Sequence, residues 1–300
     1  MPDMTRPRLR RLKTEVRDLL ELVLLPGLAA VLPWPLCFAL FRRLARWRWL
    51  YWAGCERALQ QASARGVVDD PARWHWMRRL VTLVDHADYY LSRTRGDGWL
   101  ARHVTEESAW PPAGQAAILC TFHWSAGMWG LRSAARAGLR AHALVAPLHQ
   151  DSFKGRAVLG WYARARTAEV TRVLGQEALD VSGLLRPAIR ALRAGEQVVA
   201  AVDVPADQAA ASEPVTLAGK PARVPRGLLR LAVDQRVPVT VYLTGFDPQT
   251  GRRWVRVAPL GVHEDVPALA SAVFAHLNAA LAEDPAVWHF WGEAERFFVG

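Results

Sequence analysis

The sequence predicts an α/β protein with a mostly parallel sheet flanked by helices. Three apolar runs, at residues 116–121, 197–202 and 237–244, have the length of buried strands and lie between turn-forming residues. A helical pattern over residues 184–194 precedes the second run and ends at Gly195, a typical stop signal. Short buried strands that alternate with helices are typical of a parallel sheet covered on both faces.

The remaining elements follow from the same patterns. Residues 51–110 have a mainly helical pattern, and a further helix is expected to begin near Ser125, directly after the first strand. Further strands are expected at 141–146, 215–217 and 253–258, further helices at 228–235 and 268–283, and a loop at 218–221.

The chain divides into an N-terminal segment, residues 1–52, and an α/β domain, residues 53–300. In the segment an apolar stretch, Leu19–Phe41, lies between two clusters of basic residues and is followed by Trp47, Trp49 and Trp52. About 20 apolar residues suffice to span a bilayer. We therefore expect a hydrophobic helical anchor, as a span, a helical hairpin or an in-plane helix. Three internal prolines argue against a straight span, and a buried core helix is the alternative.

Composition limits the partners. The net charge is +10, and only three of the 38 basic residues are lysines. Such a chain attracts anionic headgroups, phosphorylated glycolipids or an acidic carrier protein. Nucleic acid is disfavoured, because the basic residues are scattered and no zinc-finger or RNP-type motif is present. Three widely spaced cysteines form neither a disulfide framework nor a zinc site, which favours the cytosol and a role as small core residues.

One histidine stands where catalysis is expected. The apolar run at 116–121 ends at Phe122-His123-Trp124, so His123 follows the carboxyl end of a predicted buried strand. Ligands of α/β sheets gather at this edge. A histidine there can act as a general base, next to the free N–H groups of a helix N-terminus.

Four further blocks follow His123 along the chain. They are Leu192-Arg193-Ala194-Gly195-Glu196, Asp203-Val204-Pro205-Ala206-Asp207, the loop Leu217–Gly227 with Val237-Pro238-Val239, and Asp284-Pro285-Ala286-Val287-Trp288-His289-Phe290-Trp291. With these blocks, the hydrophobic segment with basic flanks and the strand-borne His123, the sequence resembles the bacterial lipid A biosynthesis (lauroyl/myristoyl) acyltransferase family, within the glycerolipid acyltransferase superfamily. The resemblance covers roughly residues 20–298.

The resemblance implies an acyltransferase of lipid A and lipopolysaccharide biosynthesis at the cytoplasmic face of the inner membrane. Its donor would be an acyl carrier protein or acyl-CoA thioester, and its acceptor a hydroxyl of a lipid A-type glycolipid or lysolipid. No cofactor or metal is implied, and the sequence contains no phosphate-binding or zinc-protease motif. The family signature is a histidine, four residues and then an acid that orients it. Here the acid position after His123 holds Met128.

The missing acid leaves three interpretations. Asp203 or Asp207, after another predicted strand, could reach His123 and orient it, and both are included in the predicted catalytic set. Ser125 or a backbone carbonyl could instead hold the imidazole tautomer. In the third interpretation catalysis is lost, and the chain is a lipid-binding homologue.

Other residues are candidates for substrate binding. Arg223 and Arg226 lie between Gly219 and Gly227 and could hold a phosphate, with Lys220 in the same loop. Ser125 is included in this substrate-binding set. Three C-terminal residues are expected to pack as a lid rather than to catalyse: Trp288, His289 and Trp291.

A serine hydrolase is the competing enzyme class. The sequence His123-Trp124-Ser125-Ala126-Gly127 differs from the G-x-S-x-G nucleophile elbow at its first residue. Asp203 or Asp234 and His263 or His289 could supply the other triad members. The histidine in place of the first glycine argues against this class, because the sharp turn favours a small residue there.

Overall fold

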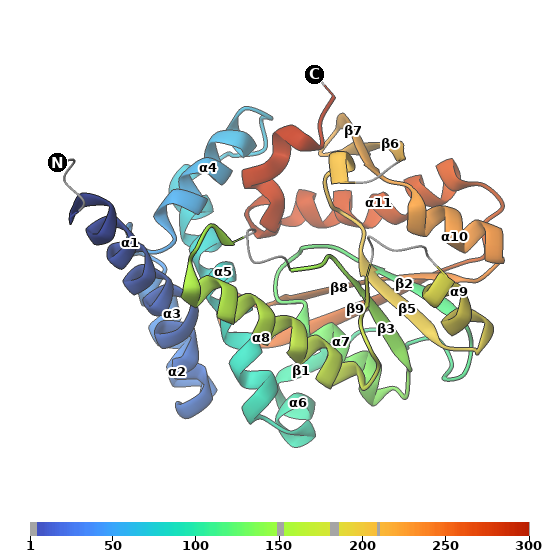
Figure 1. Ribbon diagram of the computed structural model, residues 1–300, viewed down its shortest axis with the longest axis horizontal. Helices are drawn as coiled ribbons and strands as arrows, with labels where there is room; N and C mark the ends of the chain where they lie inside the picture. Colours follow the sequence, from blue (N-terminus) through green and yellow to red (C-terminus); the bar gives the residue numbers. More distant parts are fainter. Residues whose placement is uncertain (1–4, 149–152, 181–185, 209–210, 300) are drawn as a thin grey trace.

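The computed structural model describes residues 5–148, 153–180, 186–208 and 211–299, and its centre is a seven-stranded sheet (Figure 1). The strand order is β1-β9-β8-β2-β5-β3-β4, and β6 and β7 form a separate two-stranded hairpin. The strands are β1 Val104–Glu106, β2 Ala117–Thr121, β3 Ala141–Val145, β4 Leu179–Asp180, β5 Gln197–Ala201, β6 Ser212–Leu217, β7 Lys220–Pro225, β8 Val239–Phe246 and β9 Arg253–Gly261.

The predicted fold class is confirmed, because helices flank a mostly parallel sheet. Within the seven-stranded sheet only the β8–β9 pair is antiparallel. These two strands are joined by the turn at residues 247–251, where Asp247 accepts hydrogen bonds from the N–H groups of Gln249 and Thr250 at 2.6 and 2.9 Å. The parallel strands bring their carboxyl ends to one edge of the sheet, where the candidate site lies.

The sheet separates two apolar cores, which explains why its central strands are apolar on both faces. In β2, Ile118 and Cys120 belong to one core, while Ala117 and Leu119 belong to the other. The first core includes side chains of α9 (Arg186–Arg193), α10 (Gly227–Gln235) and α11 (Val266–Glu283). The second includes side chains of α3 (Trp34–Leu44), α5 (Pro71–Thr94), α6 (Asp97–His103), α7 (Met128–Arg136) and α8 (Ala157–Leu174).

The N-terminal apolar stretch is not one continuous helix, so the expected anchor is not found in the form of a span. It follows α1 (Thr5–Asp18) and comprises a π-helical turn η1 (Leu19–Leu24), α2 (Leu25–Val31) and most of α3. The backbone is extended at Leu32 and Pro33, because proline cannot continue the hydrogen-bond ladder of α2. Among the described helices, only α11 is long and apolar enough to cross a membrane. Residues of α11 such as Val273 and Leu277 are packed in the core instead.

Helix α3 is part of the α/β core rather than an appendage. Trp34, Phe38 and Phe41 are buried, and the indole N–H of Trp34 donates to the carbonyl of Gly251 at 3.0 Å. The Arg253 guanidinium lies 4.1 Å from the Trp34 ring centroid. The alternative of a buried core helix is therefore the correct one for α3, whereas α1 packs against α8 at the edge of the molecule (Figure 1).

Four local expectations are corrected. Residues 104–106 form β1 at the sheet edge although their surroundings are helical, because β9 supplies a parallel partner. Residues 220–225 form β7, although 218–221 was expected to be a loop, because β6 pairs with them. The helix expected near Ser125 begins at Met128, and α8 was not expected at all. Residues 184 and 185 of the expected helix 184–194 lie outside the described residues.

The three cysteines are free and buried, as their spacing predicts. Burial raises the pKa of the Cys120 thiol to about 12. These thiols therefore stay protonated at neutral pH, and they pack as small apolar side chains.

Candidate active site

Parallel pairing of β2 and β5 brings His123 next to Asp203. The register matches Cys120 with Ala200 and Thr121 with Ala201, and the N–H of Val202 donates to the carbonyl of Thr121 at 2.9 Å. His123 and Asp203 each lie two residues beyond the last matched pair. Equal offsets along neighbouring parallel strands place the two side chains side by side.

The Asp203 carboxylate orients His123 through both its backbone and its ring. The backbone N–H of His123 donates to both carboxylate oxygens at 2.8 Å. Its ring Nδ1 lies 3.0 Å from Asp203 Oδ1. Asp203 has no exposed surface, and the indole N–H of Trp288 donates to its Oδ2 at 2.8 Å. The Asp203 carboxylate therefore accepts these hydrogen bonds from His123 and Trp288, and together they fix its orientation.

The geometry defines which ring nitrogen of His123 is free. An ionised carboxylate only accepts hydrogen bonds, so Nδ1 carries the proton in the neutral imidazole and Nε2 carries the lone pair. The His123 side chain is 41% exposed, and no hydrogen-bond partner of Nε2 is found among the described residues. The Phe290 ring packs edge-on at 4.3 Å between centroids. The His123 imidazole is thus held in one orientation, and the lone pair on its Nε2 is available to accept a proton.

The C-terminal segment fixes the loop that bears His123. Trp124 and Trp288 form an antiparallel bridge, and the N–H of His289 donates to the His123 carbonyl at 2.9 Å. The buried guanidinium of Arg78 in α5 donates to the carbonyls of Trp288 and His289 at 2.6 and 2.9 Å. The expected packing role of this segment is only part of its contribution, since Trp288 also holds the carboxylate.

A second polar cluster lies behind the site. His289 Nε2 donates to the Ser125 carbonyl at 2.7 Å, and burial lowers the His289 pKa to about 4. Asp85 pairs with Arg166 through contacts of 2.6 and 2.7 Å. Burial alone would raise the Asp85 pKa, but the Arg166 charge outweighs it and the result is about 2. Burial also lowers the pKa of His86 to about 3, and His86 Nδ1 lies 2.9 Å from the Tyr162 hydroxyl.

The other predicted partner of His123, Asp207, lies apart from it. Asp207 is at the turn η3 (Ala206–Gln208), where Arg296 donates to its two carboxylate oxygens at 2.9 and 2.8 Å. Its side chain is 55% exposed, and the described residues show no contact between it and His123. Met128, at the position of the family acid, is buried as the first residue of α7.

The predicted phosphate-binding residues form a hairpin of their own. Gly219 occupies a left-handed turn between β6 and β7, at φ 72°. Arg223 donates to the Ser212 hydroxyl at 2.8 Å, and Arg226 pairs with Glu213 at 3.6 Å. Lys220 is exposed at the start of β7. Within the described chain none of these side chains forms a hydrogen bond or ion pair with His123 or Asp203.

Ser125 has the backbone of a strained turn but not the surroundings of a nucleophile. Its φ is +50°, a conformation that is uncommon for residues other than glycine, and it is buried. The neighbouring His289 ring binds the Ser125 carbonyl, and among the described residues no histidine nitrogen contacts the hydroxyl. Asp234 pairs with Arg230 instead of a histidine. The triad expected for a serine hydrolase is therefore not formed in the described chain.

Two contributors to the site were not predicted from the sequence. Trp288 was expected only to pack, and Arg78 was not singled out. A buried arginine in an apolar helix is a usable signal, because such a group must find several acceptors. The acceptors themselves, three backbone carbonyls near residue 288, could not be identified without the fold.

The fold and site together define an α/β protein with an aspartate–histidine pair at the carboxyl ends of adjacent parallel strands. No protein-family model matches the chain, and no curated protein is significantly similar to it. The function therefore has to be argued from the site.

Proposed function

We propose that this protein is an O-acyltransferase that uses His123 as general base. The donor is an acyl carrier protein or acyl-CoA thioester. The acceptor is a hydroxyl of a lipid A-type glycolipid or a lysolipid at the cytoplasmic face of the inner membrane. The observation that carries the proposal is the 3.0 Å contact between Asp203 Oδ1 and His123 Nδ1. Asp203 supplies from a neighbouring strand the orienting carboxylate that position 128 lacks.

The proposed reaction needs one base and no acyl-enzyme. The acceptor hydroxyl donates its proton to His123 Nε2 while its oxygen attacks the thioester carbonyl carbon. The tetrahedral intermediate then collapses, the C–S bond breaks, and the imidazolium Nε2–H returns the proton to the leaving sulfur. An ester bond replaces the thioester bond, and His123 ends in its starting state. Asp203 stabilises the transient imidazolium and keeps its orientation.

The start of α7 is suited to the negative charge that develops on the carbonyl oxygen. The helix begins at Met128, five residues after the base. The N–H of Gly130 donates to the Gly127 carbonyl at 3.2 Å, which leaves the N–H groups of Met128 and Trp129 without an acceptor within the helix. The N-terminus of a helix carries partial positive charge, and backbone N–H donors are the usual oxyanion stabilisers in acyl transfer. In this proposal the buried Met128 side chain secures the helix start rather than contacting His123.

The direct test is an assay with defined donors. Purified protein is mixed with lauroyl thioesters of acyl carrier protein or coenzyme A and with a bacterial lipid extract, and products are identified by mass spectrometry. We expect a lipid heavier by one acyl group with wild type and none with His123→Ala. His276→Ala, on α11, is the control histidine and should retain activity. Absence of an acylated lipid with wild type, or full activity of His123→Ala, would refute the proposal.

The same assay separates the competing functions. A serine hydrolase would release free fatty acid and lose that activity in Ser125→Ala, whereas the proposed transferase largely keeps its activity in this variant. A lipid-binding homologue without catalysis would retain lipid and give no product. Mass spectrometry of whole-cell lipids with and without the gene identifies the acceptor, as a loss of one acyl group from one lipid class.

A further inference from the structure

Exposed apolar side chains are concentrated in the first 52 residues. Ten of the fourteen large apolar residues that are exposed in the described chain lie between residues 9 and 52. They are Leu9, Leu12, Val16, Leu19, Leu24, Val31, Leu36, Trp47, Trp49 and Trp52. We call this set the N-terminal apolar face. Such a concentration is characteristic of an interaction surface, because isolated exposed apolar residues would be scattered.

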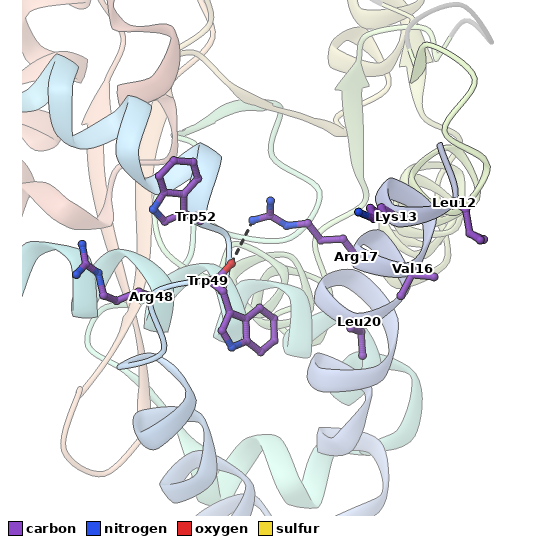
Figure 2. Close-up of a pocket in the computed structure, with 8 residues that line it drawn as sticks. All are labelled: Leu12, Lys13, Val16, Arg17, Leu20, Arg48, Trp49 and Trp52. Carbon is purple, nitrogen blue, oxygen red and sulfur yellow. Dashed lines mark hydrogen bonds between the residues drawn. The ribbon is translucent and has the colours of Figure 1, made fainter. Parts of the chain in front are cut away.

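A groove of about 760 Å³ lies within this face. Leu12, Val16 and Leu20 of α1 and η1 form one wall, and Trp49 and Trp52 form the other (Figure 2). The basic residues that line the groove are Lys13, Arg17 and Arg48. Arg17 reaches across and donates to the Trp49 carbonyl at 3.2 Å, so the two walls are joined (Figure 2). An apolar interior with basic residues at its edge matches the two ends of an anionic phospholipid.

Charges on this part of the chain are segregated. The three acids of α1 and η1 are used internally. Glu15 accepts from the N–H groups of Ala157 and Val158 at 2.7 and 3.0 Å. Asp18 pairs with Arg156 at 2.8 Å, and Glu21 accepts from the N–H of Tyr51 at 2.7 Å. Within residues 9–52, the exposed cations without an ion pair in the described chain are Arg10, Arg11, Lys13, Arg43, Arg46 and Arg48, and of these Arg11 donates to the Gly155 carbonyl at 3.0 Å.

This arrangement favours a bilayer surface over other occupants. Tryptophans and arginines beside exposed aliphatic side chains are the composition of the interfacial zone. A second copy of the chain would bring the same cations together, which costs affinity. A membrane span is excluded for α3, whose Trp34, Phe38 and Phe41 are buried in the core.

We propose that the N-terminal apolar face docks on an anionic phospholipid bilayer, with α1 lying in the plane of the interface. The acyl chain of a lipid inserts between Leu12, Val16 and Trp49, and anionic headgroups bind Lys13 on one side of the groove and Arg48 on the other. This docking is independent of the acyl-transfer chemistry.

Vesicle sedimentation with the full chain tests the proposal. The protein is mixed with phosphatidylcholine vesicles, or with vesicles containing 30% phosphatidylglycerol, a composition chosen to supply a strong negative surface. We expect at least tenfold stronger partition to the anionic vesicles, with a loss of binding as salt is raised. Equal partition to both compositions, or none to either, would overturn the proposal.

Paired variants locate the surface. Lys13→Glu with Arg48→Glu should weaken anionic-vesicle binding at least tenfold, and Trp49→Ser with Trp52→Ser should do the same. The controls Arg193→Glu on α9 and Val262→Ser after β9 are exposed elsewhere and should bind as wild type. Equal weakening in the controls would assign binding to net charge or general stickiness and overturn the proposal. His123→Ala should bind vesicles normally, so a failure of catalysis and a failure of docking give different results.

Discussion

His123 and His289 are joined by one backbone hydrogen bond of 2.9 Å, yet their surroundings give them opposite roles. The Nδ1 of His123 faces the buried Asp203 carboxylate, and its Nε2 has no hydrogen-bond partner in the described chain. His289 uses Nε2 to bind the Ser125 carbonyl, and burial lowers its pKa to about 4. The carboxylate partner of its ring distinguishes the candidate base His123 from the structural His289, whose ring is hydrogen-bonded to a backbone carbonyl.

The largest expected effect is on the rate of acyl transfer in Asp203→Asn. This variant removes the carboxylate partner that His123 has and His289 lacks. The amide can offer an N–H toward Nδ1 and so stabilise the wrong tautomer of His123. Loss of the equivalent carboxylate in serine proteases reduces kcat by about 10⁴-fold, and we expect a loss of about 10³- to 10⁴-fold here. Initial rates of acyl transfer measure it. Asp207→Asn is the matched control and should change the rate less than about twofold, because that carboxylate pairs with Arg296 at the surface. A similar loss in both variants would contradict the assignment.

Removing the partner of Asp85 has the next largest effect, on stability. Arg166→Met leaves a buried carboxylate without its guanidinium. A broken buried pair costs about 3–5 kcal/mol, and we expect roughly 3 kcal/mol because the Arg166 side chain is 28% exposed. Urea unfolding measures the loss. The double variant Asp85→Leu with Arg166→Met should recover part of the stability, since no uncompensated charge remains. A double variant less stable than Arg166→Met alone would contradict this prediction, because it would show that the unpaired Asp85 carboxylate is not the source of the loss.

The same cluster predicts acid sensitivity. The pKa values of His289 and His86 are lowered by burial to about 4 and about 3, from about 6.5 in the unfolded chain. The unfolded chain therefore binds protons first, and the free energy of unfolding falls as the pH drops from about 6.5 to about 4. Asp85, at about 2, extends the loss below pH 4.

Because both residues are only partly buried in the folded chain, we expect a loss of roughly 2 kcal/mol between pH 7 and pH 4.5, measured by urea unfolding at each pH. In His289→Gln, which can still donate to the Ser125 carbonyl but does not titrate, the slope should be shallower. An unchanged slope in this variant would mean that His289 does not contribute.

Trp288→Phe gives the smallest effect and sharpens the role of the carboxylate. The variant keeps the aromatic packing but removes the N–H that donates to Asp203 Oδ2 at 2.8 Å. We expect about a tenfold fall in kcat with little change in KM, consistent with the loss of one hydrogen bond to a charged group. A fall in stability with an unchanged kcat would reduce Trp288 to a packing role.

The candidate base could be predicted from the sequence, but its partner could only be narrowed to two residues. His123 follows an apolar run too short and too well bounded to be mistaken for a helix. Asp203 and Asp207 both follow another such run, and nothing local distinguishes them. The parallel register of β2 and β5 does, because it places Asp203 directly opposite His123 and leaves Asp207 four residues farther on.

For the N-terminal segment, the sequence predicts the kind of partner but not which helices are buried. Its apolar stretch between basic clusters predicts contact with a membrane, but hydropathy cannot tell a span from a core helix. Pro33 divides the stretch, and the burial of Trp34 against Gly251 and Arg253 assigns α3 to the core. The exposed apolar residues that remain are those of α1, η1 and the loop before α4 (Trp52–Ser63), together with Val31, Leu36 and Trp52.

The sequence by itself determined the class of fold, the strand that carries His123, and the division into apolar and basic segments, because these depend on local periodicity and composition. Only the tertiary structure decided which aspartate orients His123, that Trp288 and Arg78 support the site, and which apolar side chains stay at the surface. These outcomes depend on pairing between residues that are 80 or more positions apart, and local patterns contain no information on such pairing.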